Sequence, residues 1–306
     1  MTSSTDTRLV DGAPLAAAVH GAAEHPRRRL QLRVVPQVAL VYLGLAVMCV
    51  FILFPFVYVV GTSLRSGSAF SMLTYPPTIF PAQPSLENYR RILTELPVAR
   101  WYMNSTIMAI GVTAGEVFFC ALIGYTFAKR EFPFKNLLFA GTMATLMIPA
   151  GLTFFPAYLI TRNLGLLDTH AGLILPGIPS AFGVFMLRQF MQSIPDELID
   201  AGRIDGASEF GIFWRIVIPI SGPGLAALGI LAMNWSWNLL LWPLVVGRSK
   251  DMITLTVGLA NMTTEFNVHY GLLSAAVFLA VAPLIVGFLF FQRYFVAGLV
   301  AGASKG

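Results

Sequence analysis

The stretch VVPQVALVYLGLAVMCVFILFPFVYVVGTSL, residues 34–64, decides the fold class. It lies between Arg33 and Arg65 and holds no charged side chain. A helix that crosses the hydrocarbon core of a bilayer needs about 20 mostly apolar residues, so this run is long enough to span a membrane. It is too long for the apolar part of a signal peptide, and no small-residue cleavage pattern follows it. We therefore predict a membrane-spanning helix here.

Five further intervals between charged residues have a comparable length. Together, the six intervals predict spans at about residues 37–62, 103–128, 137–161, 169–188, 219–246 and 270–293. The composition agrees, because the chain is 56% hydrophobic and 11% charged, with a mean hydropathy of +0.72. Soluble domains carry about 25% charged residues. We predict an all-α membrane protein with six transmembrane helices.

The basic residues of the loops predict the orientation. In this arrangement thirteen Lys and Arg fall on the side of the termini and seven on the other side. Cytoplasmic loops carry the excess of Lys and Arg, so both termini are expected in the cytoplasm of a bacterial plasma membrane. The net charge of +5 is spread over short loops rather than gathered in one stripe, which favours this explanation over nucleic-acid binding.

The first 33 residues differ from the rest of the chain. They are rich in Ala, Ser, Thr, Asp and Arg without apolar periodicity, which predicts a disordered cytoplasmic leader, residues 1–33, before a transmembrane domain, residues 34–306. Cys49 and Cys120 fall inside predicted spans and are interpreted as packing residues rather than as a disulfide.

One carboxylate lies within the predicted spans. A charge at the centre of a span costs about 2.5 to 3.5 kcal/mol, so the side chain of Glu116 should face protein or water rather than lipid. Two roles stay open, a place in a translocation path or a structural hydrogen bond. Proline and glycine interrupt the later spans, which is typical of helices kinked beside a cavity and also of kinks that serve packing.

The loop between the fourth and fifth spans, about residues 189–219, holds five of the fifteen acidic residues. Ser193 is expected to cap a helix that carries Asp196 and Glu197 in its first turn. One face of this helix is expected to carry the apolar residues Ile194, Leu198, Ala201 and Ile204. Gly206 is expected to end the helix in the left-handed conformation, and Ser208 to cap a second one.

The second helix of the loop carries Phe210, Phe213 and Trp214 at spacings of three and four, an aromatic face. A helix, a glycine elbow and another helix on the cytoplasmic side permit two interpretations. The pair could lie on the lipid surface, or it could insert into the groove of a partner protein. The residues alone do not choose between them.

The same loop resembles the EAA motif of binding-protein-dependent ABC importer permeases, E-A-A-x3-G-x9-I-x-L-P. Here it is Asp200-Ala201-Gly202, three residues, Gly206, nine residues, and Ile216 to Pro219. Asp replaces Glu, Gly replaces the second Ala, and Ile replaces Leu. The resemblance implies that the loop is a coupling helix that docks into a cytoplasmic ATPase, where Asp200 pairs with an arginine. The implied ATPase-coupling residues are Asp200, Ala201, Gly202, Asp205, Gly206, Ala207, Ser208, Phe210, Phe213 and Pro219.

The chain from about residue 37 resembles the carbohydrate branch of these permeases, in the subunit like the second permease of maltose-type importers. The matching segments are 104–105, 194–198, 204–208, 237–244, 254–259 and 292–306. The resemblance implies a permease subunit that imports a disaccharide or oligosaccharide, with a glycerol-phosphate or polyol importer as the alternative. It also implies a second homologous permease, two ABC ATPase subunits and an extracytoplasmic sugar-binding protein as partners.

Other motifs bear on the energy source and on the solute. The sequence has no G-x4-G-K-[ST] phosphate loop, and its four histidines lack metal-ligand spacing. We therefore expect that this chain is not an enzyme and binds no metal or cofactor. By resemblance, ATP and Mg bind to the partner ATPases. An ion-coupled secondary transporter and a membrane enzyme are the rivals. Indoles and amides suit a sugar. The candidates for touching it are Asn234, Trp235, Trp237, Asn238 and Trp242, and Glu116 is a further candidate for the substrate path. By resemblance, residues 248–270 face the binding protein and residues 301–306 the ATPases.

Overall fold

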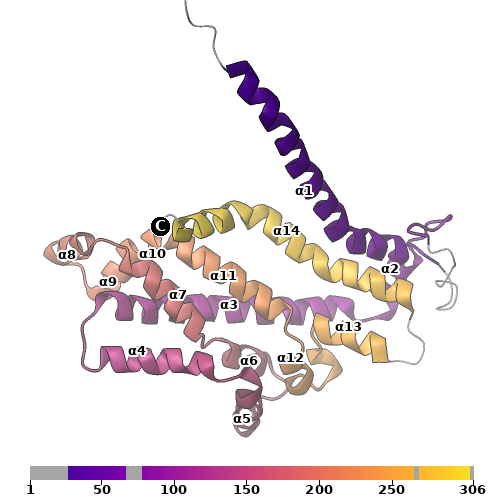
Figure 1. Cartoon of the computed structure of the whole chain (residues 1–306). Helices are drawn as coiled ribbons and strands as arrows, with labels where there is room; N and C mark the ends of the chain where they lie inside the picture. Colours follow the sequence, from indigo (N-terminus) through magenta and orange to yellow (C-terminus); the bar gives the residue numbers. More distant parts are fainter. Residues whose placement is uncertain (1–26, 67–77, 265–268, 304–306) are drawn as a thin grey trace, which may run out of the picture. The chain divides into compact units, whose positions relative to one another are not determined.

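The computed structural model describes residues 27–66, 78–264 and 269–303, and within these ranges every regular element is a helix. Figure 1 shows their arrangement. The α-helices are α1 (Arg27–Ser63), α2 (Glu87–Glu95), α3 (Val98–Lys129), α4 (Lys135–Ala144), α5 (Ala150–Asn163), α6 (His170–Ile174), α7 (Ala181–Gln192), α8 (Asp196–Ile204), α9 (Glu209–Ile212), α10 (Ile218–Ile220), α11 (Gly222–Trp237), α12 (Leu241–Val246), α13 (Leu255–Thr264) and α14 (Tyr270–Ala303). Short 3-10 turns are η2 (Thr145–Met147), η3 (Leu175–Gly177) and η5 (Lys250–Met252), and η4 (Phe213–Val217) is a π-helical turn.

The chain divides into two compact units, residues 1–56 and residues 57–306. In the first unit, α1 starts at Arg27, so residues 27–33 are helical and the predicted boundary of a disordered leader at residue 33 is too late. These seven positions hold only Arg, Leu and Gln, which favour helix. No proline or glycine among them ends the helix before the apolar run. The rest of the predicted leader, residues 1–26, lies outside the described residues.

Three helices are long and apolar enough to cross a membrane unbroken. They are the Val38–Ser63 part of α1, the whole of α3, and the Tyr270–Gly287 part of α14. These three helices match the first, second and sixth predicted spans. The prediction of an all-helical membrane protein agrees with this finding.

The three remaining predicted spans are bent pairs of helices. The axes turn by 103° between α4–η2 and α5, by 51° between α6–η3 and α7, and by 79° between α9–α10 and α11. Each break lies beside proline, at Pro149, Pro179 and Pro219. Proline lacks the N–H that continues the helix, so these three predicted interruptions are confirmed, whereas α14 continues through Pro283 without a break. The described residues therefore hold three possible spans, or up to six if each bent pair crosses once.

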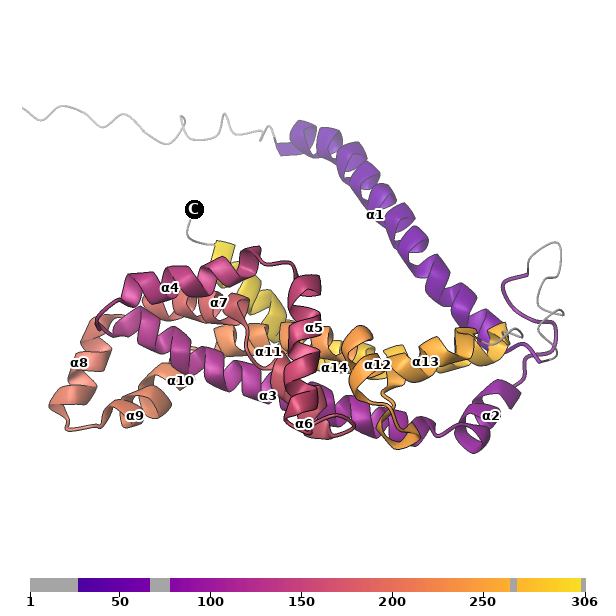
Figure 2. The same ribbon diagram turned by 90° about the horizontal axis from the view of Figure 1, so that it is seen from below.

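Helix α3 is the centre of the second unit and packs mainly against α7 and α11 (Figures 1 and 2). Glycine permits the close approach, because a Cβ on Gly124 would lie 3.1 Å from the backbone nitrogen of Arg188 in α7. Small residues at such crossings are typical of helix pairs in membranes. Three clusters of buried apolar side chains follow α3 along its length, around Tyr125, Met108 and Trp101.

The two ends of α3 carry different parts of the chain. Figure 2 shows α8 and α9 at its C-terminal end, and α2 and α13 at its N-terminal end. By contrast, α4 has no buried residue and α5 has only Thr161. The bent pair α4–α5 therefore presents apolar side chains, among them Leu138 and Leu152, outside the core of its own unit.

Candidate functional site

The loop between α7 and α11 begins differently from the prediction. Ser193 ends α7, with its Oγ donating to the carbonyl of Phe190 at 2.7 Å, and Pro195 occupies the N-cap position of α8 without a side-chain cap. The prediction that Ser193 caps α8 is therefore wrong, because the residue is still in helical conformation at the end of α7. Asp196 and Glu197 do lie in the first turn of α8, where the helix dipole stabilises negative charge.

The glycine elbow is confirmed. Gly206 has a φ of 78°, in the left-handed region that residues other than glycine rarely adopt. Its N–H donates to the carbonyl of Arg203 at 3.0 Å, and the N–H of Ala207 donates to the carbonyl of Gly202 at 3.0 Å. The Oγ of Ser208 then accepts from the N–H of Gly211 at 3.2 Å, as predicted for the cap of α9. Two short helices thus meet at a fixed bend.

The face of α8 that packs inward is narrow. Ile199 and Gly202 are buried, and a Cβ on Gly202 would lie 2.7 Å from the side chain of Ile216. Three residues of the predicted apolar face, Leu198, Ala201 and Ile204, share the exposed side of α8, whereas Ile194 precedes the helix and is buried. The buried side is formed by Ile199 and Gly202, where the close approach of Ile216 leaves little room for a Cβ.

Besides its charged residues, the loop exposes four apolar ones. The side chain of Ile204 is 87% exposed, that of Phe210 61% and that of Leu198 44%, and Ala201 is exposed between them. We call these four residues the outer face of the loop. Monomeric proteins rarely leave contiguous apolar surface uncovered, so such a patch marks a contact with another molecule.

The aromatic residues of α9 and η4 separate into two groups. Phe213 is buried, with its ring centroid 5.6 Å from that of Tyr125, so it belongs to the core. Trp214 is partly exposed and stacks on Phe118 of α3 at 6.3 Å. The predicted single aromatic face is therefore divided between the core and the surface.

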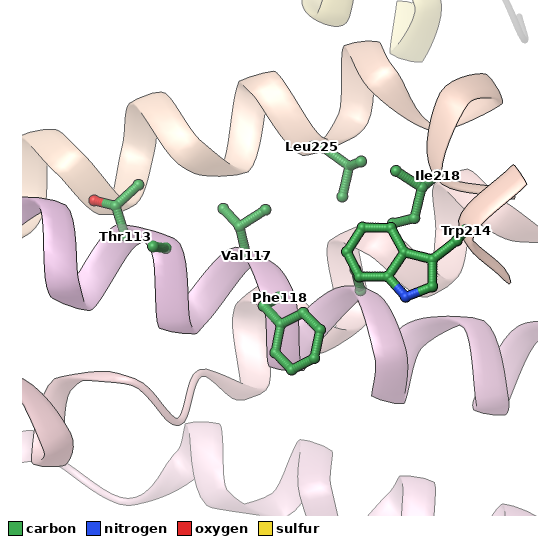
Figure 3. A pocket seen from close by; sticks show the side chains of 8 residues that line it. Thr113, Val117, Phe118, Trp214, Ile218 and Leu225 are labelled. Carbon is green, nitrogen blue, oxygen red and sulfur yellow. The ribbon is translucent and has the colours of Figure 1, made fainter. Parts of the chain in front are cut away.

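Trp214 also closes an apolar pocket of about 360 Å³ between α3 and the start of α11 (Figure 3). Its walls are Thr113, Ala114, Val117, Phe118, Ala121, Trp214, Ile218 and Leu225. Almost no polar atom lines it, so it does not suit a sugar, whose hydroxyls need hydrogen-bonding partners.

Ion pairs surround the loop. The carboxylate of Asp200 pairs with Arg203 of its own helix at 2.6 Å, and Arg203 Nε lies 3.4 Å from Glu209. Glu209 also pairs with Arg130, which follows the end of α3. The predicted pairing of Asp200 with an arginine of another protein therefore requires that the ion pair with Arg203 be shared or exchanged.

The neighbouring Lys129 holds the start of α8. Its ammonium donates to Asp196 Oδ1 at 2.8 Å and to the carbonyl of Ile194 at 2.5 Å. The hydrogen bond from Lys129 lowers the pKa of the Asp196 carboxyl below its ordinary value. From the sequence, Lys129 and Arg130 are predicted only as loop charges, although a Lys-Arg pair directly after a span is a signal for ion pairs with an acid-rich loop.

Glu116 is 7% exposed and faces protein, as expected. Its carboxylate lies beside Ser180, which is the N-cap of α7 and accepts from the N–H of Gly183 at 3.0 Å. The carboxylate thus lies at the positive end of α7, directly at the bend between η3 and α7. Cys120, one turn further along α3, donates to the carbonyl of Ser180 at 3.4 Å.

The other substrate-path candidates lie in two different environments. Trp237 and Trp242 are 5% and 7% exposed, and their indole nitrogens donate to the carbonyls of Ala280 and Gly172 at 3.3 and 3.0 Å. Asn234 and Asn238 are exposed, with the Asn238 amide donating to the carbonyl of Asn234 at 2.7 Å. The tryptophan that accompanies them at the surface is Trp235, whose side chain is 51% exposed.

At the opposite end of α3, the segment before α13 is tied to the helix. The amide of Asn104 donates to the carbonyls of Asp251 and Ile253 at 2.7 and 2.9 Å, and Ser105 Oγ accepts from the N–H of Leu255 at 2.8 Å. The predicted binding-protein segment, residues 248–270, includes residues 265–268, which lie outside the described residues. The tail from residue 304 also lies outside them.

The helices, the bent pairs and the loop together define the class of multi-pass helical membrane proteins. Residues 120–300, more than half of the chain, match the family described as "Binding-protein-dependent transport system inner membrane component". The chain therefore belongs to this family, whose members are the membrane permease subunits of ABC importers.

Individual relatives agree with this assignment. The chain is 37% identical over 268 residues to the arabinooligosaccharides transport system permease protein AraQ of Halalkalibacterium halodurans, covering 87% of this chain and 96% of the relative. It is 37% identical over 267 residues to the sn-glycerol-3-phosphate transport system permease protein UgpE of Escherichia coli O157:H7, covering 84% and 92%. A solved bacterial ABC transporter involved in alginate import has the same fold, with a TM-score of 0.76 at 24% identity over 86% of this chain and 97% of that one.

Proposed function

We propose that this chain is the permease subunit of an ATP-driven importer of disaccharides or oligosaccharides. It forms half of the translocation pathway, and the segment from Asp200 to Pro219 transmits the closure of ATPase subunits to the membrane helices. The observation that carries this proposal is the outer face of the loop, which presents Leu198, Ile204 and Phe210 on a rigid glycine bend. An apolar knob of this kind suits the groove of a partner protein.

The proposal includes the partners and the orientation. ATP and Mg bind to two ATPase subunits rather than to this chain, a second homologous permease completes the pathway, and an extracytoplasmic binding protein delivers the solute. Each bent pair counts as one span, which gives six spans with both termini in the cytoplasm. The loop then faces the cytoplasm, on the same side as the ATPases, as the excess of Lys and Arg summed over all segments on the side of the termini supports.

The names of the relatives support a sugar as the solute and keep a second candidate open. AraQ is named for arabinooligosaccharides, and UgpE for sn-glycerol 3-phosphate, at nearly the same identity to this chain. Within the chain, the exposed amides of Asn234 and Asn238 with the adjoining Trp235 suit the hydroxyls and CH faces of a sugar. The burial of Trp237 and Trp242 favours a structural role for these two candidates.

Uptake by the reconstituted complex tests the function. The chain, its second permease and the two ATPases are placed in proteoliposomes with ATP inside and binding protein outside, and labelled arabino-oligosaccharide or glycerol 3-phosphate is offered. We expect ATP-dependent accumulation of the oligosaccharide. Accumulation of glycerol 3-phosphate alone would select the second candidate.

The same proteoliposomes distinguish the rival classes. Solute uptake by the purified single chain under an ion gradient, without ATPases, would identify a secondary transporter and contradict the proposal. Chemical conversion of the solute by the single chain would identify a membrane enzyme. Neither is expected, since the chain belongs to a family of ABC importer permeases and Glu116, its one carboxylate within the predicted spans, lies buried beside Ser180.

A further inference from the structure

Helix α3 connects the two functional ends of this chain without a break. It runs over 32 residues with no proline, whereas the three bent pairs turn by 51° or more. From Asn104 to Lys129, its rise amounts to roughly 37 Å, comparable to the thickness of a bilayer. A displacement applied to one end of such a helix is carried to the other end, while a bend can absorb it.

At its C-terminal end, α3 is fastened to both helices of the coupling loop. Lys129 is 6% exposed, and its three ammonium hydrogens have three acceptors, Asp196 Oδ1 and the carbonyls of Ile194 and Gln192. Asp196 is the first residue of α8, Ile194 lies in the link before it, and Gln192 is the last residue of α7. Breaking an ion pair that is buried on one side leaves an uncompensated charge, so this attachment resists separation.

The next residue holds the second helix. Arg130 pairs with Glu209, the first residue of α9, and its guanidinium lies 5.7 Å from the ring centroid of Tyr125 in α3. Tyr125 also contacts Glu209 through its hydroxyl at 3.5 Å. Two consecutive basic residues therefore attach α8 and α9 separately to the same helix.

At its N-terminal end, α3 holds the segment that leads into α13. Asn104 and Ser105 are 0% and 1% exposed, and they bind the backbone of Asp251, Ile253 and Leu255 through three hydrogen bonds. Arg100 adds an ion pair to Asp251 at 3.5 Å. Bonds to the backbone fix the position of this segment whatever its side chains do.

We propose that Lys129 and Arg130 are positioning residues that fasten the coupling loop to α3, and that α3 transmits displacement of the loop to residues 251–255 on the opposite side of the membrane. This inference rests on the proposed function, in which the loop contacts the ATPases. It assigns a mechanical route between the ATPase contact and the outer segment, by way of one unbroken helix. Helices α7 and α11 also adjoin the loop, but each is bent at one end.

A charge exchange tests the route in the full reconstituted complex. Arg130→Glu places like charges at Glu209, so we expect binding protein to lose its stimulation of ATP hydrolysis and uptake to fall at least tenfold. The exchange R130E with E209R restores the opposite charges and should restore both readouts. The matched control is Lys135→Glu, because Lys135 forms an ion pair with Glu131 at 2.7 Å near the same end of α3 without contacting the loop. It should behave as the wild type.

The outcomes separate this inference from the proposed function. Failure of the wild-type complex to take up solute with ATP would refute the proposed function itself. If the wild type is active, the inference is overturned when binding protein still stimulates ATP hydrolysis in an assembled Arg130→Glu complex. If Arg130→Glu prevents assembly, the double variant decides. The inference is overturned if binding protein does not stimulate ATP hydrolysis in the double variant, whether or not that variant assembles.

Discussion

Gly206 sets the angle between α8 and α9 through a single backbone torsion. At φ of 78°, any side chain with a Cβ is strained, and a β-branched one most of all. No atom lies within 4 Å of the position that a Cβ would take, so the requirement for glycine is conformational and not a matter of space. The glycine of the motif is thus explained by the bend it permits.

Gly206→Val should therefore uncouple the complex rather than prevent its assembly by a clash. We expect uptake to fall at least tenfold while some ATP hydrolysis remains, because strain of the order of 1 to 3 kcal/mol shifts the loop away from its bend. The measurement is uptake and ATP hydrolysis in the same proteoliposomes. Gly165→Val is the control, since Gly165 has φ of 69° and equally open space but lies between α5 and α6. Equal uptake by wild type and Gly206→Val would refute the role of the bend.

At the scale of the elements, the sequence predicts what depends on local chemistry. The apolar intervals predict α1, α3 and α14, and the glycine and serine of the loop predict its bend and the cap of α9. It does not predict which face of α8 is buried, because that face depends on the approach of Gly202 to Ile216. Nor does it predict that Trp237 and Trp242 are buried, since an indole suits a core and a sugar site equally.

Of the two roles open to Glu116, a place in the translocation path or a structural one, the structure favours the structural role. The carboxylate lies beside the N-cap of α7 at a bend, so Glu116→Leu removes a buried polar group that faces Ser180 and should cost about 1 to 3 kcal/mol of stability. Thermal unfolding of the purified complex should show a lower midpoint for Glu116→Leu and little change for Glu116→Gln, which keeps a hydrogen-bond acceptor.

Uptake by the same two variants completes this test. If Glu116 is structural, Glu116→Gln transports like the wild type. If that variant keeps its thermal stability but loses uptake, the carboxylate belongs to the translocation path and the structural role is not sufficient.

At the scale of the whole molecule, the second unit places the coupling loop at one end of α3 and the 251–255 segment at the other (Figure 2). The number of spans cannot be settled from sequence, because three of the predicted spans are bent pairs whose crossing depends on the bilayer and on partner subunits. The exposed apolar side chains of α4 and α5 are those expected of helices that face lipid or another subunit, neither of which is present around the single chain.

The most direct test of the central claim is photo-crosslinking from position 204 in the assembled, transport-active complex. Ile204 is 87% exposed on the outer face of the loop, so a photoreactive residue there should attach covalently to an ATPase subunit. The same residue at position 164, where Leu164 is 67% exposed beyond the end of α5, should give no such product. An active complex in which position 204 reacts only with lipid, or with nothing, would contradict the account.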